Sequence, residues 1–189
     1  LASYIDIRLF SDQYISFCWG GVMSNTSRSI LCYGDSNTWG YVPGSINLKT
    51  LYMERYPRSV RWTGQLQSRL GDNYYVIEEG LNGRTTNIEY PDIPGGSGAS
   101  CILSCLYSHS PLNLVVLQLG LNDLKTFFKR TAEDVSEGLV ELVGMIQASP
   151  CGPDMQSPPS ILIVAPPLPS NEDFIDTEGE RVFTGSIEK

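Results

Sequence analysis

Short apolar runs alternate with helix-like segments along most of the chain. Runs of apolar, partly β-branched or aromatic residues at 30–33, 74–77, 114–119 and 161–165 are typical of buried strands. Helix-like stretches at 60–70, 99–107 and 131–147 lie between them. Strands that are apolar throughout and alternate with helices predict a parallel sheet covered on both faces. The pattern therefore predicts an α/β protein, built as a three-layer α/β/α sandwich.

Two of the predicted helices have clear end signals. In 60–70 the apolar residues Trp62, Leu66 and Leu70 share one face, and Gly71 closes the helix. The longest helix opens at Thr131, and Asp134 follows at the spacing of a capping box. Its apolar face is formed by Leu139, Leu142, Val143 and Ile146.

Three polar turns each follow a different predicted strand. Ser36, Gly83 and Asn122 lie in these turns. Right-handed crossovers place the carboxyl ends of parallel strands at one edge, which is where open α/β sheets bind ligands. We therefore expect the three residues to converge on one site.

These residue types suit acyl transfer on a serine. A tetrahedral intermediate at an ester carbonyl needs hydrogen-bond donors for its oxyanion. The N–H groups of Ser36 and Gly83 and the side-chain amide of Asn122 would supply them, since glycine admits close backbone approach and an amide carries no charge to desolvate. Structural alternatives remain: Ser36 as a helix N-cap, Gly83 as a turn glycine and Asn122 as a cap of the next segment.

The segments around these residues resemble the first three conserved blocks of the SGNH hydrolases, also called GDSL esterases. They are GDSNTWG at 34–40, the glycine in EEGLNGRTT at 78–86, and GLND at 120–123. Longer stretches, such as RWTGQLQSRLG and ILIVAPPL, are similar to the arylesterase/acyltransferase branch of that family. The resemblance extends from about residue 29 to the C-terminus.

The resemblance implies an SGNH hydrolase fold with a flavodoxin-like sheet and an esterase that needs no metal or organic cofactor. Ser36 would be the nucleophile, and Ser36, Gly83 and Asn122 would form the oxyanion hole. Small or aryl esters would be the substrates, with acyl transfer to alcohols or peroxide, and the complete protein would be a homo-oligomer. Trp39 and Pro166, which follow strands at the same edge, are candidates to line the substrate pocket, with simple packing as the alternative.

One expected block is not found in the sequence. The family places its triad Asp and His in a D-x-x-H block, whereas the single histidine here is His109. His109 precedes the strand at 114–119 and Ser36 follows a strand, so a span of about 17–20 Å should separate the two residues. We therefore expect the chain to stop before its acid–base pair and last βα unit, and to have little esterase activity.

Composition removes several other classes of function. The formal net charge is -8 and no basic block is present, so no nucleic-acid partner is expected. No stretch is long and apolar enough to span a bilayer. The five cysteines and one histidine match no zinc-site spacing, and the odd cysteine count favours a reducing, cytoplasmic location.

The two ends define the expected domain. Residues 1–22 lack an initiator Met and a signal-peptide pattern, while Met23 has the character of a chain start. We expect 1–22 to be an extension outside the fold, disordered or loosely docked. We expect 23–189 to be one SGNH hydrolase domain, incomplete at its C-terminus.

Two other functions remain open. The turn at 34–40 could be the anion-binding loop of a flavodoxin-like binding module, although it contains no lysine and no G-x-x-x-x-G-K-[ST] pattern. The chain could also be a pseudoenzyme that only binds its ligand. Near the site, Asp35 and Asp123 are expected to be structural carboxylates and Arg84 an ion-pair partner.

Overall fold

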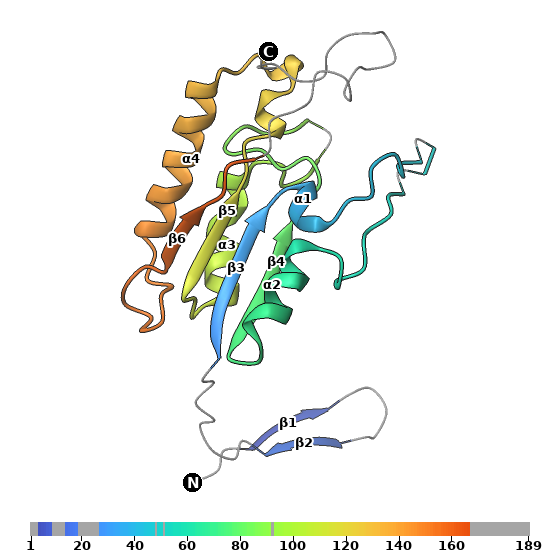
Figure 1. The fold of residues 1–189 in the computed structure, drawn as a ribbon. Helices are drawn as coiled ribbons and strands as arrows, with labels where there is room; N and C mark the ends of the chain where they lie inside the picture. The colour runs from blue at the N-terminus through green and yellow to red at the C-terminus, as the bar shows by residue number, and fades with distance from the viewer. Residues whose placement is uncertain are drawn as a thin grey trace.

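The centre of the molecule is a four-stranded parallel sheet (Figure 1). The computed structural model describes residues 4–8, 14–18, 27–47, 49–50, 52–91 and 93–166. The strand order is β4-β3-β5-β6, and the strands are β3 (Arg28–Gly34), β4 (Tyr74–Gly80), β5 (Leu114–Gln118) and β6 (Ser160–Ile163). The predicted strands and their parallel pairing are confirmed.

Three long helices cover the two faces of the sheet. One face, with Leu31 and Leu117, packs against α3 (Gly98–His109) and α4 (Ala132–Gln147). The other, with Cys32 and Val76, packs against α2 (Trp62–Leu70). Figure 1 shows α3 and α4 on the side of the sheet away from α2. The predicted three-layer α/β/α sandwich is confirmed.

Local end signals predicted the longest helix well. Thr131 is the N-cap of α4, its side chain accepts from the N–H of Asp134, and the Asp134 carboxylate accepts from the Thr131 N–H in return. Both bonds satisfy N–H groups that the first helical turn leaves without partners. The predicted capping box is confirmed.

Strand β4 is longer than predicted. The sequence suggested an end at Ile77 because two glutamates follow, yet β4 continues to Gly80 in register with β3. The two glutamates alternate between faces, and each has a basic partner: Glu78 lies 3.1 Å from Arg61, and Glu79 lies 2.7 Å from His109. These pairings accommodate the charges, so the strand need not stop.

The segments at the ends of the chain are described only in part. Strands β1 (Tyr4–Arg8) and β2 (Tyr14–Cys18) form an antiparallel pair that the sequence did not predict. That 1–22 lies outside the fold stays a prediction. Residues 167–189 lie outside the described residues, and the expectation that the domain is incomplete at its C-terminus stays a prediction. Within the described ranges, no helix has the length and apolar character needed to cross a membrane.

Candidate active site

Strand β3 ends in a tight turn that presents Ser36. Gly34 closes the strand, and a Cβ there would lie 2.2 Å from Thr38 Oγ1, so only glycine fits. Asp35 is the N-cap of the short helix α1 (Ser36–Trp39), because its carboxylate accepts from the N–H of Asn37 at 2.9 Å. The N-cap interpretation of Ser36 is therefore wrong, and Asp35 is the structural carboxylate that the sequence indicated. Ser36 itself is half-buried at the first helical position.

Gly83 lies in the turn after β4. Its φ is +79°, and a Cβ there would lie 2.2 Å from Ile93 Cδ1. Two main-chain bonds shape this turn: Leu81 N–H donates to Gly34 O and Arg84 N–H donates to Leu81 O, both at 3.1 Å. The first of these ties the Gly83 turn to the end of β3, directly before Asp35 and Ser36.

Asn122 connects the other two turns. It begins the 3-10 helix η1 (Asn122–Leu124) after β5, and only 5% of its surface is exposed. Its Nδ2 donates to Arg84 O at 3.0 Å and lies 3.5 Å from Asp35 Oδ2. One amide thus contacts the residue before Ser36 and the residue after Gly83. The predicted convergence of the three turns is confirmed, although their separate catalytic roles stay predictions.

The carboxylates of the site are buried. Burial raises the pKa of Asp35 to about 6, against the lowering effect of hydrogen bonds from Asn37 and of the Arg84 charge. Burial also raises the pKa of Asp123, although bonds from Thr86 and the charge of Arg130 oppose it. Asp123 is fully buried and accepts from the Thr86 N–H at 3.0 Å, which confirms it as a structural carboxylate.

Arg84 differs from its expected role. Within the described residues it has no ion pair. Its guanidinium donates instead to the main-chain carbonyls of Gly34 and Glu79. The expected ion pair is not found among the described residues, where the acceptors are strand-end carbonyls whose position depends on the fold.

Trp39 and Pro166 both lie near the carboxyl edge. Trp39 is half-buried on α1, where its main chain packs against Gly80, and the Arg55 guanidinium lies 5.0 Å from its ring centre. Pro166 Cγ lies 3.9 Å from where a Cβ of Gly120 would be, two residues before Asn122. Their role in lining the pocket stays a prediction.

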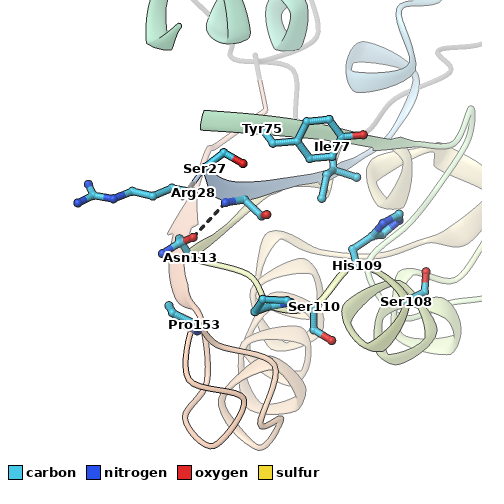
Figure 2. Close-up of a pocket in the computed structure, with 11 residues that line it drawn as sticks. Ser27, Arg28, Tyr75, Ile77, Ser108, His109, Ser110, Asn113 and Pro153 are labelled. Carbon is cyan, nitrogen blue, oxygen red and sulfur yellow. Dashed lines mark hydrogen bonds between the residues drawn. The ribbon is translucent and has the colours of Figure 1, made fainter. Parts of the chain in front are cut away.

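His109 lies at the opposite edge of the sheet. It ends α3 and lines a pocket of about 480 Å³ with Ser29 and Asn113, residues at the amino ends of β3 and β5 (Figure 2). Its Nε2 lies 2.7 Å from Glu79 Oε1. Glu79 lies one residue before the carboxyl end of β4, so the imidazole reaches along the sheet, and the expected span of about 17–20 Å between His109 and Ser36 stays a prediction.

Sequence reasoning missed an aromatic cluster beside Gly83. The Tyr90 ring lies 5.5 Å, centre to centre, from both Phe127 and Phe128, in edge-to-face geometry. A Cβ on Gly83 would lie 3.6 Å from the Tyr90 ring. The only sequence signal was the Phe-Phe pair shortly after Asn122. Among the described residues, no group of His, Cys, Asp and Glu side chains is arranged to hold a metal ion.

Comparisons with known proteins bear on the family of this chain. The family model of the GDSL-like lipase/acylhydrolase family matches residues 32–182. A comparison with curated proteins gave no match.

Several solved structures are similar. The native aryl esterase of Mycobacterium smegmatis has 40% identity and a TM-score of 0.74, covering 85% of this chain and 73% of that one. Its inhibitor-bound form has 44% identity and a TM-score of 0.69, covering 76% and 67%. A carbohydrate acetylesterase from Sinorhizobium meliloti has 40% identity and a TM-score of 0.69, covering 77% and 68%. The chain therefore belongs to the GDSL-like lipase/acylhydrolase family and is a carboxylic ester hydrolase of the SGNH type.

Proposed function

We propose that Ser36 is the nucleophile and that the N–H groups of Ser36 and Gly83 and the Nδ2 of Asn122 form the oxyanion hole. The main support is the position of Asn122, whose amide lies 3.0 Å from Arg84 O and 3.5 Å from Asp35 Oδ2. The longer contact is at the limit of a hydrogen bond, so this side of the amide is weakly engaged and suited to a developing oxyanion.

The reaction is acyl transfer through Ser36. The Ser36 Oγ attacks the ester carbonyl, the alcohol leaves with a proton, and an acyl-Ser36 ester remains. Water then releases the acid, or an alcohol takes the acyl group. Small and aryl esters are the proposed substrates, since the similar proteins include an aryl esterase and a carbohydrate acetylesterase.

Among the described residues, no hydrogen bond joins a histidine to the Ser36 hydroxyl. The single histidine of the 189 residues, His109, ends α3 and pairs with Glu79 at 2.7 Å. A serine hydroxyl is a weak nucleophile without an adjacent base. We therefore propose that these residues turn esters over slowly.

The anion-binding alternative has less support. Anion sites at helix starts depend on free N–H groups. Here the Asp35 carboxylate already accepts from the Asn37 N–H, and α1 has only four residues. A negative side chain in this position disfavours a phosphate.

The oligomer expected from the family is also part of the proposal. Ile46 and Tyr52 are 42% and 64% exposed. They lie in the loop that extends from the carboxyl edge after α1 (Figure 1), where a second copy could cover them. Sedimentation of the complete protein would test this: a dimer or larger species supports it and a monomer contradicts it.

Labelling with a fluorophosphonate probe tests the nucleophile. We expect slow labelling, which mass spectrometry should map to Ser36. Ser36→Ala should abolish it. The control variant Ser29→Ala, which replaces a half-buried serine at the amino end of β3, should keep it. Equal labelling of the Ser36→Ala variant would refute the nucleophile, and no labelling at all would favour the pseudoenzyme. Rapid hydrolysis of p-nitrophenyl acetate by the 189-residue chain would refute the proposed lack of a base.

A further inference from the structure

One buried cation contacts all three turns. Arg84 follows Gly83 directly, and only 5% of its surface is exposed. Its Nη1 donates to Gly34 O at 3.1 Å and also to Glu79 O. Its guanidinium carbon lies 4.1 Å from the centre of the Tyr33 ring. The side chain therefore holds the carboxyl ends of β3 and β4 together, directly before the turn that presents Ser36.

The main chain of Arg84 serves the other two turns. Its N–H donates to Leu81 O at 3.1 Å, which closes the turn around Gly83. Its carbonyl accepts from Asn122 Nδ2 at 3.0 Å, which sets the direction of that amide. A shift of Arg84 would thus move each proposed oxyanion donor.

No carboxylate in the described part of the chain lies within 4.0 Å of the Arg84 guanidinium, although Asp35 is near enough for this charge to lower its pKa. Its Nε, which is also buried, has no hydrogen-bond partner. A buried guanidinium without a paired carboxylate is costly in free energy. A catalytic site can use such a charge, because a fixed cation in a region of low dielectric stabilises negative charge that develops nearby.

We propose that Arg84 is a positioning residue of the oxyanion hole: it fixes Gly34, Gly83 and Asn122 relative to one another and places a buried positive charge behind the donors. An anionic tetrahedral adduct on Ser36 should gain more from this arrangement than a neutral planar ligand. This inference rests on the proposed function of Ser36.

Phenylboronic acid tests the inference without requiring a catalytic base. Boron accepts a lone pair of the Ser36 Oγ, the hydroxyl proton passes to buffer, and the adduct is tetrahedral and anionic. No bond to carbon breaks, and nothing is oxidised or reduced. Benzamide, which is planar and neutral, serves as the comparison ligand. Titration calorimetry gives both dissociation constants, and their ratio measures the preference for the anion.

Two variants of Arg84 separate positioning from simple stability. Arg84→Met should weaken boronate binding by about ten- to a hundredfold and benzamide binding much less, so that the ratio of the two dissociation constants changes. Arg84→Lys should recover part of the loss, because it keeps the charge and lacks the planar donor set. The matched control is Arg58→Met, since Arg58 also donates to a strand carbonyl, that of Val76, away from the three turns.

The outcomes distinguish the two proposals. If the ratio of the benzamide and boronate dissociation constants is the same in Arg84→Met as in the unaltered chain, the proposed role of Arg84 is overturned. If Arg84→Met does not fold, the same comparison is made with Arg84→Lys, and an unchanged ratio again overturns it. If Ser36→Ala binds the boronate as well as the unaltered chain does, the nucleophile proposal itself fails.

Discussion

The Asp123 carboxylate accepts hydrogen bonds from both the main-chain N–H and the hydroxyl of Thr86, 37 positions earlier in the chain. Arg130 Nη1 lies 2.9 Å from the same carboxylate. Asp123 follows Asn122 directly, and Thr86 lies three residues after Gly83. This buried contact therefore fixes two of the three site turns relative to each other.

Replacing Asp123 should destabilise the fold. Asp123→Asn removes the negative charge that faces Arg130. It also turns the new amide NH₂ towards the buried donors of Thr86 or Arg130. The free energy of unfolding should therefore fall by about 2–4 kcal/mol. Urea denaturation measures the change. The control is Asp154→Asn, whose exposed carboxylate accepts from Ser157 and Gln156 and should cost much less. Equal losses in the two variants would contradict the role of Asp123.

The pKa of Asp35 predicts a pH dependence of stability. Burial raises this pKa to about 6 from an ordinary value of 3.8, so between these pH values the folded protein binds more protons than the unfolded chain. The stability that this group contributes is full below about pH 4 and is lost as the pH rises towards 6, by about 2–3 kcal/mol. Asp35→Asn should abolish this loss.

Urea denaturation of both proteins between pH 4 and 7 tests the sign. Relative to the unaltered chain, Asp35→Asn should gain stability as the pH rises through this range. Asp123, whose pKa burial also raises, titrates with the same sign in both proteins and cancels in the difference. A difference that does not change with pH would refute the raised pKa.

The sequence predicted the parts of the fold that local signals determine. Apolar runs followed by Gly34 or Gly120 indicated strand ends, and the Thr131–Asp134 spacing indicated a helix start. The order of strands then brought Ser36, Gly83 and Asn122 to one edge. What the sequence missed depends on partners far away in the chain: β4 extends because Glu78 and Glu79 meet Arg61 and His109.

The same reason explains why the contacts of Arg84 with strand-end carbonyls were not predicted. Its acceptors lie 50 and 5 positions away, and the larger separation has no local signature. Identifying Asp35 rather than Ser36 as the helix cap likewise required the backbone geometry of the turn. Residue types indicated which chemistry is present, and only the fold showed which groups support it.

Close packing between β4 and α1 gives a third prediction. A Cβ on Gly80 would lie 2.2 Å from the main-chain nitrogen of Trp39, an atom that cannot move aside. Gly80→Ala should therefore displace α1, cost about 1–3 kcal/mol and reduce probe labelling of Ser36. Gly144→Ala is the control, since nothing lies within 4 Å of its Cβ position on α4. It should stabilise the helix by up to about 1 kcal/mol.

Thermal unfolding and labelling of both variants measure these effects. We expect Gly80→Ala to lower the melting temperature and Gly144→Ala to raise it. A Gly80→Ala variant as stable and as reactive as the unaltered chain would show that α1 is not held against β4 in this way.

His109 supplies the last prediction, because it is the only histidine that could act as a base within these residues. Its side chain and that of Glu79 are 29% and 30% exposed, so the pair should contribute no more than about 1 kcal/mol to stability. His109→Ala should fold normally and leave fluorophosphonate labelling and boronate binding at Ser36 unchanged. Glu79→Gln, which removes the partner charge and keeps the main-chain carbonyl that Arg84 contacts, should behave in the same way. A loss of labelling in a folded His109→Ala variant would mean that the imidazole assists Ser36, which the expected span of about 17 Å, the length of the five residues of β5, does not allow. Such a result would contradict the expectation that His109 is too far from Ser36 to take its proton.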